Sequence, residues 1–274
     1  MPTATQVFET AAREGRMTFM PFLTAGDPDP ETTAQLIQAL GEAEVDLIEL
    51  GFPYSDPIAD GPVIQASYTR ALASGLTVDS IFTMMQDLPT DELPPIFAMV
   101  SFALIFSYGT DSFAKRAAVA GFSGLIVPDL PTEESEDFAR QAAGHHLDLV
   151  QLIAPTTSRE RTETILKASR GFVYCISVAG TTGVRNELPV ELIQQLRQLR
   201  QQTRLPLAVG FGISSPDQAG ALKNVADGVI VGSAIVRLAA EAGSPAEAVR
   251  AVRRFAAEMT QAVRAIAPSA RSLS

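Results

Sequence analysis

The chain has 274 residues, of which 46% are hydrophobic and only 19% are charged. This composition provides apolar material for a large core and excludes a natively disordered chain. The net charge of −10 disfavours non-specific binding to nucleic acid or to anionic membranes, so an anionic ligand would need a local binding device such as backbone amides at a helix start.

The beginning of the chain predicts no export or membrane insertion. Residues 1–17 lack both a basic start and an apolar centre, which excludes a signal peptide. The longest apolar stretch, residues 96–106, is too short and too interrupted to span a bilayer. We therefore expect a cytoplasmic protein. Its one cysteine, Cys175, lies in an apolar run and is expected to be a small core residue rather than a nucleophile.

Eight short apolar runs alternate with longer amphipathic segments along the chain, and we expect each run to be a strand. The runs are Phe19–Thr24, Leu47–Gly51, Ile96–Phe102, Gly124–Val127, Leu149–Ile153, Phe172–Ile176, Leu207–Val209 and Gly228–Val231. Helices are expected over Pro30–Ala43, Pro62–Ala73, Val78–Leu88, Asp111–Ala120, Thr132–Ala143, Pro189–Gln202 and Pro245–Ala267, with Asp111 and Thr132 as N-caps.

This alternation predicts the fold class. Runs that are apolar on both faces suit parallel strands covered by helices. Eight such units without a break in composition predict one α/β domain over residues 1–274, a (β/α)8 TIM barrel with extra N-terminal and C-terminal helices. Residues 268–274 are expected to be a frayed tail. An open doubly wound sheet is the alternative, but the turn at residues 24–28 lacks its glycine-rich fingerprint.

Two strand-to-helix connections are long, at residues 52–61 and 178–187. Such loops lie on the active-site face of a barrel, so both are candidate lids. Glu49 ends the strand before the first of them. A carboxylate there would point into the barrel mouth, where desolvation would raise its pKa and suit it to proton transfer. The alternative is a buried structural glutamate that neighbouring hydroxyls satisfy.

Asp60 closes the first long loop, which prolines at both ends hold in shape. It is either a second catalytic carboxylate or only the N-cap of the helix that begins at Pro62. Asp56 and Asp129 are weaker candidates of the same type, and support or interface roles suit them better.

Glycines after the seventh and eighth strands predict a phosphate site. Gly212 follows the seventh strand, and Gly232 and Ser233 follow the eighth and open a helical turn. In this fold the corresponding loops bind phosphate through backbone amides. Gly183 could add a third contact when the sixth loop closes. The alternative is that these glycines only allow tight turns in a crowded barrel.

Nothing in the sequence predicts a metal site. The two histidines, His145 and His146, are adjacent at a predicted helix end and cannot both face one ion from a regular element. We expect them on a surface turn.

At these positions the sequence resembles the tryptophan synthase alpha chain family. The matching stretches, in order along almost the whole chain, are MPFLTAGDP at 20–28, ELGFPYSDPIADGPVIQ at 49–65, LIVPDLPTEE at 125–134, GTTG at 180–183, GFGISSPDQ at 210–218 and VGSAIV at 231–236. The second is highly specific, whereas the phosphate loops occur in other barrels too.

The resemblance implies a lyase that cleaves indole-3-glycerol phosphate to indole and glyceraldehyde 3-phosphate in tryptophan biosynthesis, without a cofactor of its own. It implies Glu49 as the acid/base and Asp60 as the partner of the indole N–H. The implied substrate-binding residues are Phe22, Ile64, Ile126, Tyr174 and Phe211 around the ring, Gly183, Gly212, Gly232 and Ser233 at the phosphate, and Thr182 on the lid.

The resemblance also implies a beta-chain partner that carries pyridoxal phosphate (PLP), in an alpha2-beta2 assembly. Pro53, Asp56 and Pro57 would face that partner. The chain departs from the family pattern at Ser101 and Ala103, where an aromatic residue and an asparagine are common. Phe102 points to the other face on the strand period. Thr181 and Val178 in the lid depart as well.

Three other functions remain open from the sequence. Another phosphate-sugar barrel, such as an epimerase or indoleglycerol-phosphate synthase, would explain the glycines but not the two carboxylates. The synthase would also need a lysine in a strand, and Lys115, Lys167 and Lys223 lie outside the expected strands. A stand-alone lyase and a catalytically weak subunit that mainly activates a beta chain are the other two.

Overall fold

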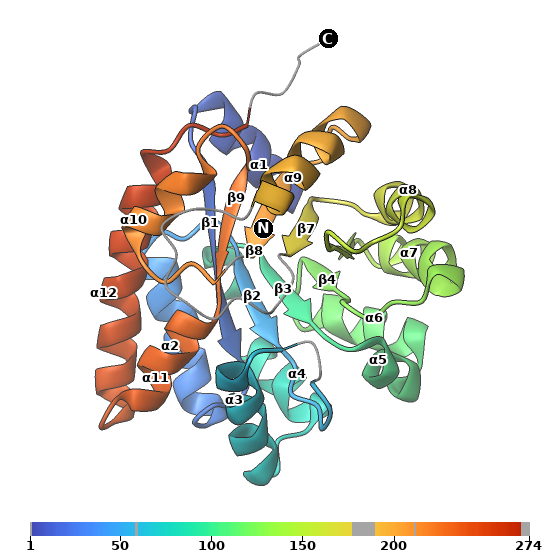
Figure 1. The fold of residues 1–274 in the computed structure, drawn as a ribbon. Helices are drawn as coiled ribbons and strands as arrows, with labels where there is room; N and C mark the ends of the chain where they lie inside the picture. Colours follow the sequence, from blue (N-terminus) through green and yellow to red (C-terminus); the bar gives the residue numbers. More distant parts are fainter. Residues whose placement is uncertain (1, 58–59, 177–189, 211, 270–274) are drawn as a thin grey trace.

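Strands and helices alternate in a computed structural model that describes residues 2–57, 60–176, 190–210 and 212–269 (Figure 1). The strands are β1 (Thr18–Thr24), β2 (Ile48–Gly51), β3 (Ile96–Met99), β4 (Gly124–Ile126), β5 (Asp148–Val150), β6 (Leu152–Ile153), β7 (Val173–Ile176), β8 (Leu207–Gly210) and β9 (Gly228–Val231). All pair in parallel, in the order β5-β4-β3-β2-β1-β9-β8-β7-β6.

The first and last strands of this order, β5 and β6, are neighbours in the sequence. Only Gln151 separates β5 from β6, and each pairs with a different neighbour, β4 and β7. The sheet therefore closes on itself with eight strand positions. This confirms the predicted (β/α)8 barrel, with the expected fifth strand divided into two short pieces.

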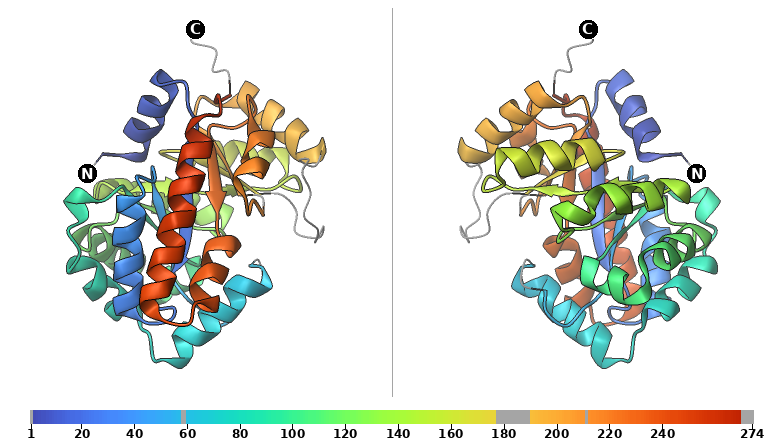
Figure 2. Two further views of the ribbon diagram at one scale, coloured as in Figure 1. Left: turned by 90° about the vertical axis from the view of Figure 1, so that its left-hand side faces the viewer. Right: turned by 90° about the vertical axis from the view of Figure 1, so that its right-hand side faces the viewer.

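Helices surround the strands on the outside (Figures 1 and 2). They are α1 (Ala4–Arg13), α2 (Pro30–Glu42), α3 (Pro62–Ala73), α4 (Val78–Gln86), α5 (Phe102–Tyr108), α6 (Thr110–Val119), α7 (Ser135–Gly144), α8 (Arg159–Ala168), α9 (Val190–Gln202), α10 (Pro216–Ala219), α11 (Ser233–Glu241) and α12 (Pro245–Arg264). Short 3-10 turns are η1 (Thr90–Glu92), η2 (Thr132–Glu134) and η3 (Gly220–Leu222). The C-terminal α12 packs outside the barrel beside α2, as expected, with an ion pair between Arg253 and Glu42 at 2.9 Å.

Three details of the expected elements are wrong. The third strand ends at Met99 rather than Phe102, because the chain turns there into α5 with Ser101 as its N-cap. Asp111 is not an N-cap, since Gly109 holds that position before α6. Thr132 begins the 3-10 turn η2, and α7 follows with Glu134 at its N-cap.

Alternate residues of the strands serve two separate cores. In β2, Ile48 and Leu50 pack in the layer between strands and helices. The residue between them, Glu49, faces the barrel interior. There Met20, Phe97 and Ile126 of other strands form a second cluster. Any side chain at position 49 is therefore directed into the barrel.

Aromatic packing closes the amino-terminal end of the barrel, and two ion pairs lie at the same end. Phe8 of α1 packs on Phe172 with ring centroids 5.5 Å apart. Asp46 accepts from the backbone N–H of Phe19 at 2.9 Å and pairs with Arg16. Asp227 accepts from the backbone N–H of Leu207 at 2.8 Å and pairs with Arg200. It also accepts a hydrogen bond from the hydroxyl of Ser269. Access to the interior therefore comes from the other, carboxyl end of the strands.

Candidate active site

Glu49 lies inside the barrel near the carboxyl end of β2. It is only 1% exposed, and the strand register places it between Phe22 of β1 and Phe97 of β3. Neither carboxylate oxygen has a hydrogen-bond partner among the described residues. This contradicts the alternative of a structural glutamate satisfied by hydroxyls. Burial raises the pKa of Glu49 well above its ordinary value, which favours the protonated form of the side chain.

Asp60 stands at the end of the loop that follows β2. It is not a helix cap, because Gly61 is the N-cap of α3 and makes no side-chain capping bond. Hydrogen bonds hold the backbone around Asp60 in place. The side-chain amide of Gln65 donates to the carbonyl oxygens of Asp60 at 2.7 Å and of Pro57 at 3.1 Å. Burial raises the pKa of Asp60, and the nearby hydroxyl of Tyr54 offsets part of that rise. The carboxylate is therefore free of a capping role and held near the barrel mouth.

The sequence patterns did not indicate two further tyrosines that lie at this site, Tyr54 and Tyr68. Their rings are 5.6 Å apart. Burial and the charge of Asp60 raise the pKa of Tyr54 to about 12. Burial also raises the pKa of Tyr68 and of Tyr174, and Glu49 and Asp60 add to both rises. Each phenol stays protonated at neutral pH and can act as a hydrogen-bond donor to a carboxylate.

Apolar side chains line the space beside the carboxylates. Phe22 and Ile64 belong to one cluster with Tyr68 and Val236. Ile126 and Tyr174 belong to the interior cluster, and Met99 contacts both clusters. Four of the five residues expected around a ring are thus found along one connected apolar wall. The fifth, Phe211, lies outside the described residues.

The predicted phosphate glycines have room for a ligand. A Cβ built at Gly212, which has φ of +49°, meets nothing within 4 Å. At Gly232 the nearest atoms are Cδ1 of Ile64 and Cβ of Phe22, both at the ordinary contact distance of 3.6 Å. Ser233 opens α11, whose first turn has no side-chain cap. Crowding therefore explains neither Gly212 nor Gly232, although the positive φ of Gly212 fits a tight turn. Uncapped amides at a helix start can bind an anion.

The glycines and the carboxylate share one edge of the barrel. Strand β9, which carries Gly232 at its end, pairs with β1, and β1 pairs with β2. Phe22 of β1 is opposite Glu49 and also contacts the Gly232 position. Thr182 and Gly183 of the predicted lid, residues 178–187, lie outside the described residues.

The expected partner-facing residues differ in exposure. Asp56 is exposed and Pro57 is half-buried, whereas Pro53 is buried within the chain itself. Ser101, one of the departures from the family pattern, donates from its hydroxyl to Asp129 at 2.7 Å. The same carboxylate accepts from the N–H of Phe102, also at 2.7 Å, so Asp129 caps α5. Phe102 packs in the layer between strands and helices, but as the first residue of α5, so the strand period used to predict its direction does not apply.

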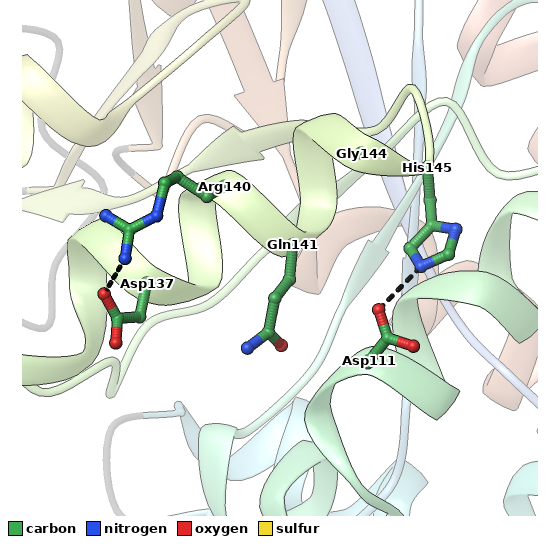
Figure 3. A pocket seen from close by; sticks show the side chains of 6 residues that line it. All are labelled: Asp111, Asp137, Arg140, Gln141, Gly144 and His145. Atoms are coloured by element: carbon green, nitrogen blue, oxygen red, sulfur yellow. Dashed lines mark hydrogen bonds and ion pairs between the residues drawn. The ribbon is translucent and has the colours of Figure 1, made fainter.

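Other chemistry-bearing groups lie away from the mouth. A surface pocket of about 470 Å³ between α6 and α7 contains His145, which is 2.9 Å from Asp111 (Figure 3). This is the expected surface turn, and no group of three metal-ligating side chains occurs among the described residues. Cys175 is fully buried, which raises the pKa of its thiol to about 12. Lys115 and Lys167 lie in helices and Lys223 follows η3, so none is on a described strand.

A buried glutamate with a raised pKa on β2 and an uncapped helix start after β9, both at the carboxyl end of a (β/α)8 barrel, are typical of an acid–base enzyme of the phosphate-binding barrel class. The comparisons with known proteins narrow this class. The family profile described as "Tryptophan synthase alpha chain" matches residues 8–264. The chain belongs to the tryptophan synthase alpha chain family.

Relatives of that name are similar over nearly their whole length. The chain is 46% identical to the tryptophan synthase alpha chain of Picosynechococcus, over 96% of this chain and 100% of the relative. It is also 46% identical to that of Synechocystis, over 93% and 97%. Among solved structures, the tryptophan synthase alpha subunit of Legionella pneumophila superposes with a TM-score of 0.87 at 36% identity, over 97% and 100% of the chains. A chain of Mycobacterium tuberculosis tryptophan synthase gives 0.87 at 32%, over 95% and 98%.

No described helix has both the length and the apolar character needed to cross a membrane.

Proposed function

We propose that this chain is the lyase subunit that cleaves indole-3-glycerol phosphate to indole and glyceraldehyde 3-phosphate in tryptophan biosynthesis. The observation that carries the proposal is Glu49, a buried carboxylate without a partner among the described residues, one strand from Phe22 and two strands from the Gly232 turn. Membership of the family and the names of the relatives support the choice of reaction.

The proposed reaction needs a group that first gives and then takes a proton. Protonated Glu49 donates to C3 of the indole ring, and the ring takes up the positive charge. The resulting carboxylate removes the proton from the hydroxyl on C3′ as the C3–C3′ bond breaks. The electron pair of that bond returns to the ring, which leaves as indole, and C3′ becomes the aldehyde. The raised pKa of Glu49 suits both steps near neutral pH.

Asp60 has a separate role in this scheme. Its carboxylate accepts from the indole N–H and stabilises the positive charge that protonation places on the ring. The protonated ring acts as the electron sink, so the reaction proceeds without a cofactor on this chain. Thr182 of the lid would contact Asp60 upon closure.

The remaining site residues hold the two ends of the substrate. Phe22, Ile64 and Phe211, with Ile126 and Tyr174, would surround the ring. The amides at Gly212, Gly232 and Ser233, joined by Gly183, would bind the phosphate. This assignment explains how a chain with a net charge of −10 can hold an anion with backbone dipoles alone.

We further propose that the chain works in the cytoplasm as a single domain and as the alpha subunit of an alpha2-beta2 assembly. The beta chain, which carries PLP, would receive the indole. Asp56 and Pro57 present surface for that contact, with Pro53 shaping the loop behind them. The names of relatives such as the Mycobacterium tuberculosis tryptophan synthase support the partnership.

An indole-release assay on the purified chain, with and without a tryptophan synthase beta chain, tests this function. We expect indole-3-glycerol phosphate to be cleaved and Glu49→Gln to abolish turnover while a phosphate ligand still binds. Glu9→Gln on the exposed face of α1 is the matched control and should keep full activity. Wild-type turnover in Glu49→Gln contradicts the assignment of Glu49. Activity without a beta chain indicates a stand-alone lyase, and negligible cleavage with strong stimulation of a beta chain indicates an activating subunit.

A further inference from the structure

Polar contacts attach α3 to the end of β1 and to the loop that follows it. The hydroxyls of Ser67 and Thr24 are buried and 2.7 Å apart. About one turn later in the helix, Arg70 donates two hydrogen bonds, of 2.8 and 2.7 Å, to the buried carboxylate of Asp27. These contacts fix α3 on the outside of the barrel. A side chain near the start of this helix can therefore hold the loop that precedes it.

Gln65 occupies such a position in the first turn of α3. Its backbone N–H donates at 3.0 Å to the carbonyl oxygen of Gly61, the N-cap. Helical side chains lean toward the N-terminus of their helix. Accordingly, Nε2 of Gln65 donates to the carbonyl oxygens of Asp60 at 2.7 Å and of Pro57 at 3.1 Å. A side-chain amide has two N–H donors, so both donors of Gln65 bind backbone that lies outside the helix.

Asp60 is held on both sides of its Cα by this arrangement. Its N–H donates to the carbonyl oxygen of Pro57 at 3.1 Å, and its own carbonyl oxygen accepts from Gln65. The Pro57 carbonyl accepts from both residues, so the three residues are joined by a closed set of hydrogen bonds. Gly61 has no side chain with which to hold the loop. The Cα from which the Asp60 carboxylate extends is therefore held relative to α3 by the side chain of Gln65.

The proposed reaction makes the place of this carboxylate important. A hydrogen bond to the indole N–H requires a separation of about 2.7–3.2 Å, so a displacement of about 1 Å at Asp60 would weaken it. Glu49 is positioned by β2, and the predicted phosphate amides follow β8 and β9. Neither of these two parts of the site is bonded to Gln65. Loss of the Gln65 amide should therefore affect the stabilisation of charge on the ring more than the binding of the phosphate.

We propose that Gln65 is a positioning residue of this site, whose side-chain amide holds Asp60 where its carboxylate can accept from the indole N–H. The catalytic consequence rests on the proposed function, and in it Gln65 acts on the reaction only through Asp60. The hold on Asp60 itself is a property of the protein without substrate, so it can be measured separately.

Hydrogen exchange in the unliganded protein tests the hold on Asp60. Gln65→Met keeps the length and the helix propensity of the side chain but removes both donors. The N–H of Asp60 should exchange about tenfold faster in this variant, whereas the N–H of Arg70 should keep its rate. Gln202→Met is the matched control, because Gln202 is also an exposed helical glutamine that donates to a backbone carbonyl, at 3.3 Å. An unchanged exchange rate at Asp60 overturns the proposal.

Indole release tests the catalytic consequence. Gln65→Met should lower kcat about tenfold with little change in KM, because the charge on the ring develops only during the reaction. In an Asp60→Asn background the same substitution should have no further effect on the residual rate. A wild-type kcat in Gln65→Met, or an equal fall in both backgrounds, overturns the proposal. If the wild type releases no indole, the proposed function fails, and the exchange rates alone decide whether Gln65 holds Asp60.

Discussion

At the scale of single residues, Glu49 should make the stability of the protein depend on pH. Its pKa is raised by burial, so the folded state binds this proton more tightly than the unfolded state does. The stabilisation is fully present below the unfolded pKa of about 4.3 and is lost as the pH rises through the raised folded value. A difference of one pH unit between the folded and unfolded pKa values corresponds to about 1.4 kcal/mol of stability.

Glu49→Gln removes this titration and should therefore gain stability relative to the wild type as the pH rises. Urea unfolding at pH 4 and pH 8 measures the two free energies of unfolding. We expect the difference, variant minus wild type, to be larger at pH 8. An equal difference at both pH values would show that Glu49 titrates at its ordinary pKa.

Gly232 offers a test of the phosphate site that leaves the fold intact. A methyl group there meets Ile64 and Phe22 only at ordinary contact distances. Gly232→Ala should fold normally, but the added methyl group should obstruct approach of the phosphate to the amides of the turn. We expect KM to rise about tenfold, which is a loss of roughly 1.4 kcal/mol of binding free energy, with little change in kcat. Steady-state kinetics measure both. Gly144→Ala, where a Cβ meets nothing, is the control, and an unchanged KM in Gly232→Ala would count against the site.

The sequence predicts the positions and roles of some site residues better than those of others. Glu49 could be placed because a strand end in a barrel has a known direction. Asp60 could not, since one sequence pattern fits both a cap and a free carboxylate, and the structure decides by using Gly61 as the cap. Tyr68 gave no signal, because its position opposite Gly51 depends on how α3 packs across β1 and β2.

At the scale of elements, the junction between β3 and α5 depends on one distant carboxylate. The apolar run of residues 96–102 does not show where the strand stops. Asp129, 28 residues from Ser101 in sequence, accepts from the Ser101 hydroxyl and from the N–H of Phe102 and so fixes the helix start. Long-range contacts of this kind are absent from local sequence patterns, and this is why the predicted strand was too long.

Loss of this contact should weaken the start of α5. Ser101→Ala removes one of the two hydrogen bonds and should cost about 1 kcal/mol, because Asp129 itself is exposed and keeps its bond to Phe102. Ser107→Ala on the same helix is the control and should cost less, since its bond to Ala103 is on the surface. Chemical denaturation of these variants, of Asp129→Ala and of the Ser101→Ala, Asp129→Ala double variant measures the coupling. Additive losses would mean that the two side chains do not act together.

At the scale of the whole molecule, the barrel separates a closed end from an open one. The alternation of apolar runs was sufficient to predict eight parallel strands. Gln151, the one polar residue in the fifth run, did not by itself show that the strand divides there. Phe8 closes the end opposite the site and is 1% exposed. Phe8→Ala should lower the free energy of unfolding by about 3–5 kcal/mol, as for other buried aromatic residues.

The same variant should keep the kcat and KM of the wild type below its melting temperature, because Phe8 and the carboxylates lie at opposite ends of the strands. Thermal unfolding and initial rates measure the two effects separately. Phe106→Ala provides a control, since Phe106 is 67% exposed and its truncation should change stability little. A fall in kcat that parallels the fall in stability would show that the two ends are coupled.

Both ends of the described chain lie near the amino-terminal ends of strands, since Ala4 packs beside Gly171 before β7 and Ser269 bonds to Asp227 before β9. A tag, a surface anchor or a second protein joined at either end would therefore start on the side away from the opening. Immobilised on a support through such a tether, the molecule would still present its mouth to the solution, and small molecules could enter and leave without passing the point of attachment.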